Sequence, residues 1–104
     1  MDSLGYLEEM VLLLILTMNN EAYGLSVSEA YQTHTGKSIS ISAIHTVLSR
    51  LEKKGLIRSE MRGATEERGG RRKRIFEASA AGRETIDQIR LSREQLWSRL
   101  PRTI

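Results

Sequence analysis

The first third of the chain carries two helical patterns of apolar residues. From Leu4 to Met18 apolar side chains recur at spacings of three and four, which predicts a helix over this segment. Leucines also occupy its other faces, so the helix is expected to be buried on most sides, either as the central core helix of a monomer or partly against a second chain. A second helix is expected over residues 22–35, with Gly36 at the left-handed position that ends many helices.

A third helix is predicted over residues 41–54. Ser40 is its expected N-cap, because a serine hydroxyl can accept a hydrogen bond from a first-turn amide, and Gly55 is expected to end it. Its apolar face is predicted to consist of Ile41, Ile44, Leu48 and Leu51. Its outer face carries Ser42, His45, Thr46, Ser49 and Arg50.

Two short, partly alternating segments follow, at residues 56–62 and 72–78, and they predict a β-hairpin with a long glycine-rich tip. Ser79 is the expected N-cap of a last helix that runs to about Leu100. Three helices, a hairpin and a further helix predict a mainly α chain with a small β-hairpin (α+β). This order is typical of a winged helix-turn-helix with an added C-terminal helix.

Two domains are expected, a winged-helix domain over residues 1–78 and a C-terminal dimerisation helix over residues 79–104. The first helix and the last helix both carry more apolar surface than a chain of 104 residues is expected to cover alone. A homodimer is therefore predicted. The predicted dimer interface consists of Leu4, Leu7, Val11, Ile86, Ile89, Leu96, Trp97 and Leu100.

The net charge of +3 conceals a strong asymmetry along the chain. Residues 1–36 hold five acids and no Lys or Arg, whereas residues 37–74 hold eleven bases and four acids. Such a concentration of positive charge favours a polyanionic partner. The densest part is the hairpin tip and the start of its second strand: Arg68, Gly69, Gly70, Arg71, Arg72, Lys73 and Arg74. This cluster could also be a solvated basic loop or a localisation signal.

The composition argues against catalysis, a metal site, a cofactor and a membrane partner. The chain has no cysteine, and its two histidines, His34 and His45, have no spacing that builds a metal site. No phosphate-binding or dinucleotide-binding glycine motif is present. The apolar run of residues 10–16 is far shorter than the ~20 residues of a membrane span. We therefore expect a cytoplasmic protein that is not an enzyme.

The third helix and the hairpin together predict a site for double-stranded DNA. Small polar residues and arginine at the start of a helix can reach phosphates and base edges, and densely placed cations can neutralise phosphates. The predicted recognition residues are Ser40, Ser42, His45, Thr46, Ser49 and Arg50. Any solvent-exposed helix face is polar, however, and Arg50 could instead pair with Glu52 or Glu60. A winged helix that binds another protein is the alternative function.

Six segments in this order resemble the PadR-like family of transcriptional regulators. They are residues 4–9 (LGYLEE), 21–24 (EAYG), 40–44 (SISAI), 48–57 (LSRLEKKGLI), 68–74 (RGGRRKR) and 79–82 (SAAG). The resemblance covers residues 4 to about 90. One departure is His45, which stands where such sequences usually carry tyrosine.

The resemblance implies a bacterial or archaeal repressor that binds operator DNA as a homodimer. It implies further that the last helix packs against the partner chain, including the partner's first helix. A single short last helix is similar to the smaller subgroup of the family. Some relatives bind flat aromatic compounds between the chains, so Trp97 is either a contact for an aromatic effector or simply part of the dimer interface.

Overall fold

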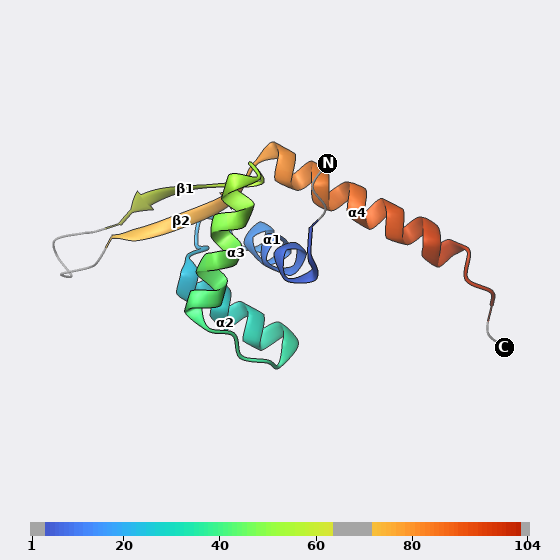
Figure 1. Ribbon diagram of the computed structural model, residues 1–104, viewed down its shortest axis with the longest axis horizontal. Coiled ribbons are helices and arrows are strands. Elements are labelled where there is room, and N and C mark those ends of the chain that lie inside the picture. The colour runs from blue at the N-terminus through green and yellow to red at the C-terminus, as the bar shows by residue number, and fades with distance from the viewer. Residues whose placement is uncertain (1–3, 64–71, 103–104) are drawn as a thin grey trace.

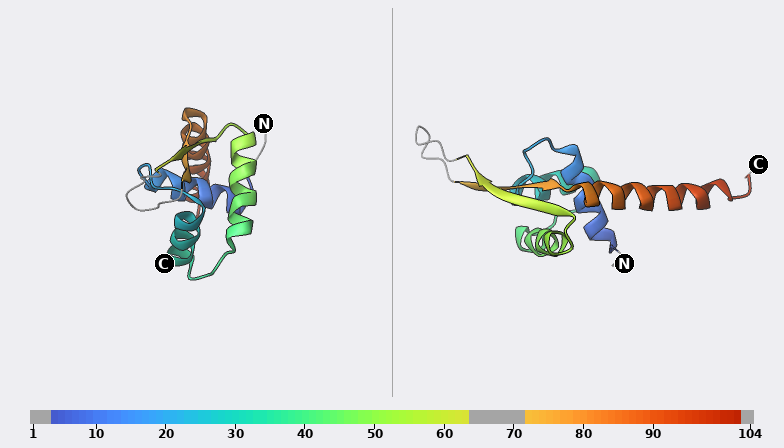
Figure 2. Two further views of the ribbon diagram at one scale, coloured as in Figure 1. Left: turned by 90° about the vertical axis from the view of Figure 1, so that its left-hand side faces the viewer. Right: turned by 90° about the horizontal axis from the view of Figure 1, so that it is seen from above.

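The computed structural model describes residues 4–63 and 72–102, and its elements follow the predicted order. They are α1 (Tyr6–Thr17), α2 (Gly24–Thr35), α3 (Ile41–Lys53), β1 (Ile57–Arg62), β2 (Lys73–Ala78) and α4 (Ala80–Ser98). The chain measures 61 × 30 × 22 Å, with the hairpin and α4 pointing to opposite ends of its long axis (Figures 1 and 2). The predicted α+β fold class is confirmed. No helix within the described ranges has the length and apolar character needed to cross a bilayer.

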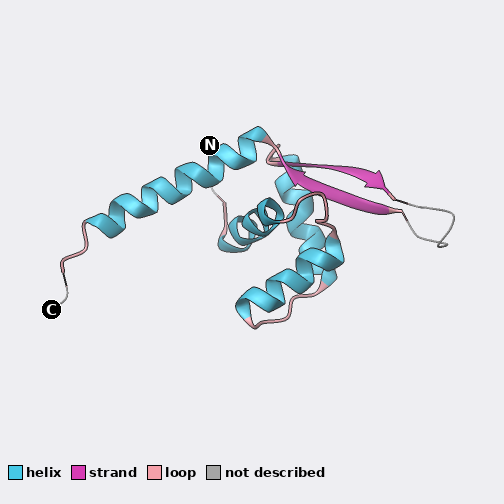
Figure 3. Cartoon of the chain, turned by 180° about the vertical axis from the view of Figure 1, so that it is seen from behind, coloured by secondary structure: helices cyan, strands magenta, loops and turns pink. Residues whose placement is uncertain are grey.

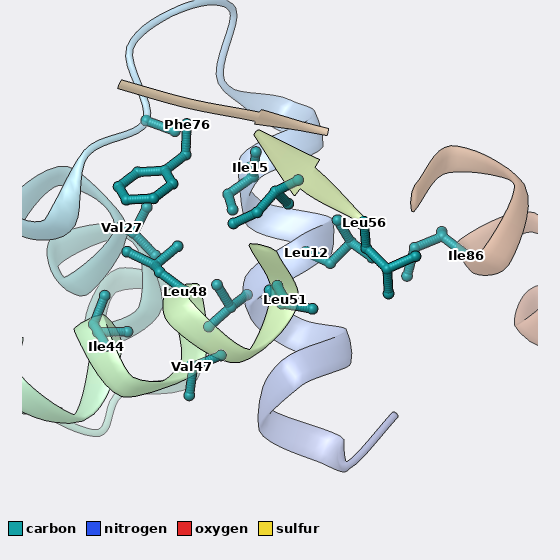
Figure 4. Close-up of a cluster of buried hydrophobic side chains, with 13 residues drawn as sticks. Leu12, Ile15, Val27, Ile44, Val47, Leu48, Leu51, Leu56, Phe76 and Ile86 are labelled. Atoms are coloured by element: carbon teal, nitrogen blue, oxygen red, sulfur yellow. The ribbon is translucent and has the colours of Figure 1, made fainter. Parts of the chain in front are cut away.

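The core lies where α1, α2 and α3 meet the base of the hairpin. Leu12, Val27, Ile44 and Leu51 are completely buried there, and Figure 4 shows these side chains pointing toward one another from three helices. Burying such side chains is the main stabilising contribution, at roughly 1.5–3 kcal/mol for each large one. Most of the apolar side chains of α1 are therefore covered by other residues of the same chain.

Three predictions about apolar positions are wrong. Val11 is completely buried and Ile86 is 7% exposed, so both fill the chain's own core and offer no surface to a partner. Ile41 was expected on the buried face of α3, but it is 45% exposed because it occupies the first helical position, beyond the edge of the core.

The two ends of α3 form as expected. The Ser40 hydroxyl accepts a hydrogen bond from the Ala43 amide at 3.0 Å. At the other end Gly55 has a φ of 75°, and the Leu56 amide donates to the Leu51 carbonyl at 3.0 Å. This is the Schellman arrangement, which ends the helix sharply and turns the chain into β1.

The hairpin is antiparallel and attached to the helices at its base. Its register places Ile57 opposite Ala78 and Arg62 opposite Lys73. The Phe76 amide also donates to the Ala22 carbonyl at 2.8 Å, so the connection between α1 and α2 adds a bridge to the free edge of β2. This third contact supports a hairpin that would be marginal alone.

The first part of α4 packs closely on the rest of the chain. The Ser79 hydroxyl accepts from the Gly82 amide at 3.1 Å and donates to the Gly55 carbonyl at 2.7 Å. One turn later Ile86 points from α4 toward Leu56 (Figure 4). Figure 3 shows the remainder of the helix leaving the group of helices at the hairpin base.

Candidate nucleic-acid interface

The outer face of α3 is exposed along its whole length. Ser42, His45, Thr46, Ser49 and Arg50 are all exposed, while Ile44 and Leu48 face the core. The predicted division of this helix into a buried and a free face is therefore confirmed. Substitutions on the outer face can change what the helix contacts without opening the core.

Hydroxyls on this face differ in their availability. The hydroxyl of Ser40 caps the helix, and that of Thr46 donates to the Ser42 carbonyl at 3.1 Å. Within the described ranges the hydroxyls of Ser42 and Ser49 make no hydrogen bond. Both are thus free to bind a ligand without breaking an internal contact.

His45 lies against the start of α2. A Cβ atom added to Gly24 would lie 2.8 Å from Nε2 of His45, so the absence of a side chain at Gly24 makes room for the ring. The imidazole remains exposed on its other side. This contact joins two helices and was not predicted, because the outward spacing of His45 along α3 says nothing about α2.

The alternative ion pairs proposed for Arg50 are wrong. Glu52 accepts a hydrogen bond from the Ser59 hydroxyl at 2.8 Å, and Glu60 pairs with Arg62. Arg50, Glu52 and Glu60 all belong to the described residues, and Arg50 forms an ion pair with neither carboxylate. Arg50 is exposed on the outer face of α3, and its positive charge contributes to lowering the pKa of Glu8.

Part of the predicted basic cluster belongs to the described hairpin, where Arg72, Lys73 and Arg74 are exposed. Arg68, Gly69, Gly70 and Arg71 lie outside the described residues. The Lys73 ammonium stands 4.2 Å from the ring centroid of Tyr23, at cation–π distance. Tyr23 precedes Gly24 in the chain, so Lys73 of the hairpin and His45 of α3 meet at adjacent residues at the start of α2.

A buried acid fixes the C-terminal end of α3. Lys54 donates to both carboxylate oxygens of Glu8, at 2.9 and 3.1 Å, and the Gly5 amide donates to the same side chain at 3.0 Å. Burial of Glu8 by itself raises its pKa, but the Gly5 amide and the Lys54 ammonium outweigh this effect. The pKa of Glu8 therefore lies below its usual value.

Comparison with known proteins places this geometry in a family. The model of the transcriptional regulator PadR-like family matches residues 12–88, which is most of the chain. The chain belongs to this family. It is thus a PadR-like transcriptional regulator, and the predicted winged helix-turn-helix is confirmed. No curated protein is matched by the sequence.

Several solved structures are similar to this PadR-like chain. A PadR-like transcriptional regulator from Bacillus cereus is 22% identical, with a TM-score of 0.72 over 88% of this chain and 84% of that one. A transcriptional regulator from Streptococcus is 25% identical, with a TM-score of 0.71 over 88% and 85% of the two chains. Bacillus subtilis PadR, solved in complex with operator DNA, is 17% identical, with a TM-score of 0.66 over 95% of this chain and 50% of that one.

The other surface of interest in this PadR-like chain is the end of α4. Leu96, Trp97 and Leu100 are 57–71% exposed, whereas Ile89 and the α1 residues Leu4 and Leu7 are half-buried. A cavity of about 330 Å³ lies where α4 crosses α1, and Trp97 contributes to its wall. Among the described residues, no group of three or more His, Asp or Glu side chains could hold a metal ion.

Proposed function

We propose that this PadR-like chain is a homodimeric repressor that binds an inverted-repeat operator. In this proposal α3 enters the major groove, and Arg72, Lys73 and Arg74 bind the flanking phosphates or the minor groove together with the cations of residues 68–71. The observation that carries it is that Lys73 contacts Tyr23 and His45 lies against Gly24, so the cationic hairpin and the exposed face of α3 both pack on the start of α2. A structurally similar protein, Bacillus subtilis PadR, was solved in complex with operator DNA, which supports a DNA-binding role for this chain.

Each element has a separate task in this proposal. The free hydroxyls of Ser42 and Ser49, with His45 and Arg50, contact base edges and so determine the preferred sequence. The hairpin cations contact phosphates, which supplies affinity without sequence information. The cation–π contact with Tyr23 orients the Lys73 ammonium before DNA arrives.

The dimer in this proposal forms through α4. Leu96, Trp97 and Leu100 present apolar surface that the chain itself leaves uncovered, and a second copy of α4 would cover it. Two-fold symmetry then places two copies of α3 about one DNA turn, ~34 Å, apart on the two half-sites. Light scattering at micromolar concentration should give twice the chain mass of 11.8 kDa.

Selection of bound DNA from a random pool tests the proposal directly. The expected product is an inverted repeat. Ser42→Ala should then alter the preference at one position in each half-site by about 1–3 kcal/mol and leave non-specific binding nearly unchanged. Replacing Arg72 and Arg74 by Ala should weaken binding to every sequence and flatten the dependence of log K on log salt by about one unit per lost phosphate contact.

Failure to select any DNA sequence would favour the alternative function, a winged helix that binds another protein. A pool that never becomes enriched, together with salt-independent capture of a protein partner, would identify the chain as a winged-helix protein-interaction module. An enriched sequence whose binding does not depend on Ser42, Ser49 or the hairpin cations would place DNA on another face of the molecule.

The cavity beside Trp97 supports a further proposal about regulation, in which an aromatic effector stacks on the indole. Its volume of about 330 Å³ suits a small planar molecule, and Leu13 contributes an apolar side chain to its wall. Trp97 is the only tryptophan, so quenching of intrinsic fluorescence reports on it alone. A panel of planar aromatic compounds that leaves the fluorescence unchanged would leave Trp97 with a role in the dimer interface only.

A further inference from the structure

The exposed second half of α4 forms an ion pair with α1. Nη1 and Nη2 of Arg93 donate to the two carboxylate oxygens of Glu9, at 2.6 and 2.7 Å. This is the bidentate arrangement, which fixes direction as well as distance. The two residues are separated by nearly the whole chain, so the pair joins α4 to α1.

The Glu9 side chain is only 11% exposed, although it is charged. It lies on α1 next to Glu8, which binds Lys54 at the end of α3. Two adjacent acids of α1 thus connect it to both functional helices, one to the recognition helix and one to α4. Any change in the direction of α4 relative to α3 must displace one of these two contacts.

Arg93 lies beyond Ile86 on α4, so a contact at Arg93 strongly constrains the direction of the helix. Gly82, Ile86, Ile89 and Arg93 follow spacings of three and four, so they share one face of the helix. After Ile86 the helix continues for about 18 Å to Ser98, at 1.5 Å per residue. A tilt of about 10° at Ile86 would move its end by ~3 Å, close to the rise of one DNA base pair.

We propose that Arg93 and Glu9 are positioning residues that fix the direction of α4 and thereby set the spacing of the operator half-sites. The inference rests on the proposed homodimer, because in such a dimer α4 determines how far apart the two copies of α3 stand. A rigid attachment then makes the protein discriminate between half-site spacings, as well as between base sequences.

The chain contains a matched control for this role. Arg90 lies one turn before Arg93 and pairs with Glu94 of the same helix at 3.7 Å. Arg90→Gln removes one cation from α4, as Arg93→Gln does, but it breaks a contact that cannot hold the helix against α1. Glu9→Gln breaks the Arg93 contact from the other side and should reproduce the effect of Arg93→Gln.

Electron spin resonance distances measure the direction of α4 without DNA. The chain has no native cysteine, so nitroxide labels on Gln32→Cys in α2 and Gln95→Cys in α4 would be unique. Labelled chains are diluted with unlabelled ones, so that most dimers carry labels on one protomer. The distance distribution should broaden at least twofold in Arg93→Gln and Glu9→Gln and stay narrow in Arg90→Gln. An equally narrow distribution in all four proteins would overturn the inference, whether or not the chain binds DNA.

Operators with altered spacers test the consequence. The native protein should prefer one spacing by about tenfold over spacers that are one base pair longer or shorter. Arg93→Gln should reduce this preference to about threefold or less, and Arg90→Gln should retain it. A broadened distance distribution with an unchanged spacing preference would overturn the role in operator spacing. Failure of the native protein to bind any operator would instead refute the proposed function, and the label distances would still decide the positioning role.

Discussion

Gly82 of α4 lies close to the backbone of Leu56, and replacing it by alanine should destabilise the protein. A Cβ atom at this position would lie 2.1 Å from the Leu56 carbonyl oxygen and 3.1 Å from its carbon. Ordinary contact requires about 3.4 Å or more, so the first turn of α4 must move away by about 1 Å. The same carbonyl accepts the Ser79 amide at 2.9 Å, and this hydrogen bond is lost in the move.

The size of the effect follows from these contacts. The hydrogen bonds of Ser79 to Leu56 and Gly55 contribute about 1 kcal/mol each, and disturbed packing at Ile86 costs about 1 kcal/mol more. Alanine returns about 1 kcal/mol, because it favours a helix more than glycine does. The net loss is about 2 kcal/mol, which lowers the melting temperature by roughly 10 °C for a chain of this size.

Thermal unfolding followed by circular dichroism, at one fixed protein concentration, measures this loss. Gly36→Ala is a suitable control, since Gly36 has a φ of 75° but no atom within 4 Å of the added methyl group. It should cost about 1 kcal/mol through backbone strain alone. A Gly82→Ala protein that melts at or above the native temperature would refute the account of α4 given above.

Further substitutions have defined outcomes. Because the pKa of Glu8 is lowered in the folded state, its contact with Lys54 stabilises the protein above pH ~4.5 and is lost as the pH falls through the folded pKa. Glu8→Gln should therefore cost about 1 kcal/mol at pH 7 in urea unfolding, and this cost should shrink progressively as the pH falls below ~4.5; a pH-independent cost would contradict this reasoning. Leu51→Ala should cost about 2–5 kcal/mol in the same assay, because the Leu51 side chain is 0% exposed. Leu25→Ala is the control: Leu25 is 47% exposed, so its loss should change the stability by no more than ~0.5 kcal/mol. Equal costs for the two variants would show that the core is elsewhere. Ser40→Ala should cost about 1 kcal/mol through the lost N-cap, and Ser40→Asp should restore most of it unless the hydroxyl has another role.

The elements of the fold were largely predictable from the spacing of apolar residues. The predicted bounds of α2, α3 and β1 differ from the observed ones by two residues or fewer, because helix and strand periods are local properties. The interface was less predictable. Val11 and Ile86 have the pattern of buried residues, but a pattern does not say whether the covering surface belongs to the same chain.

The contacts around the candidate site could not be read from local patterns. Lys73 and Tyr23, and likewise Arg93 and Glu9, are far apart in the sequence and meet only after the helices pack. The acids offered one signal, since Glu9 lies among the apolar residues of the predicted first helix. A charged residue at such a position needs a partner of opposite charge, although the sequence alone does not identify which cation supplies it.

The bridge between Ala22 and Phe76 has a consequence for the order of folding. It closes a loop of roughly half the 104-residue chain, so the entropy of bringing its ends together must be overcome before the contact forms. The three helices are built from nearer neighbours and can assemble earlier. Attachment of the hairpin base is therefore expected late, after the helical nucleus exists. In a φ-value study, substitutions at Phe76 should accelerate unfolding and leave the folding rate nearly unchanged.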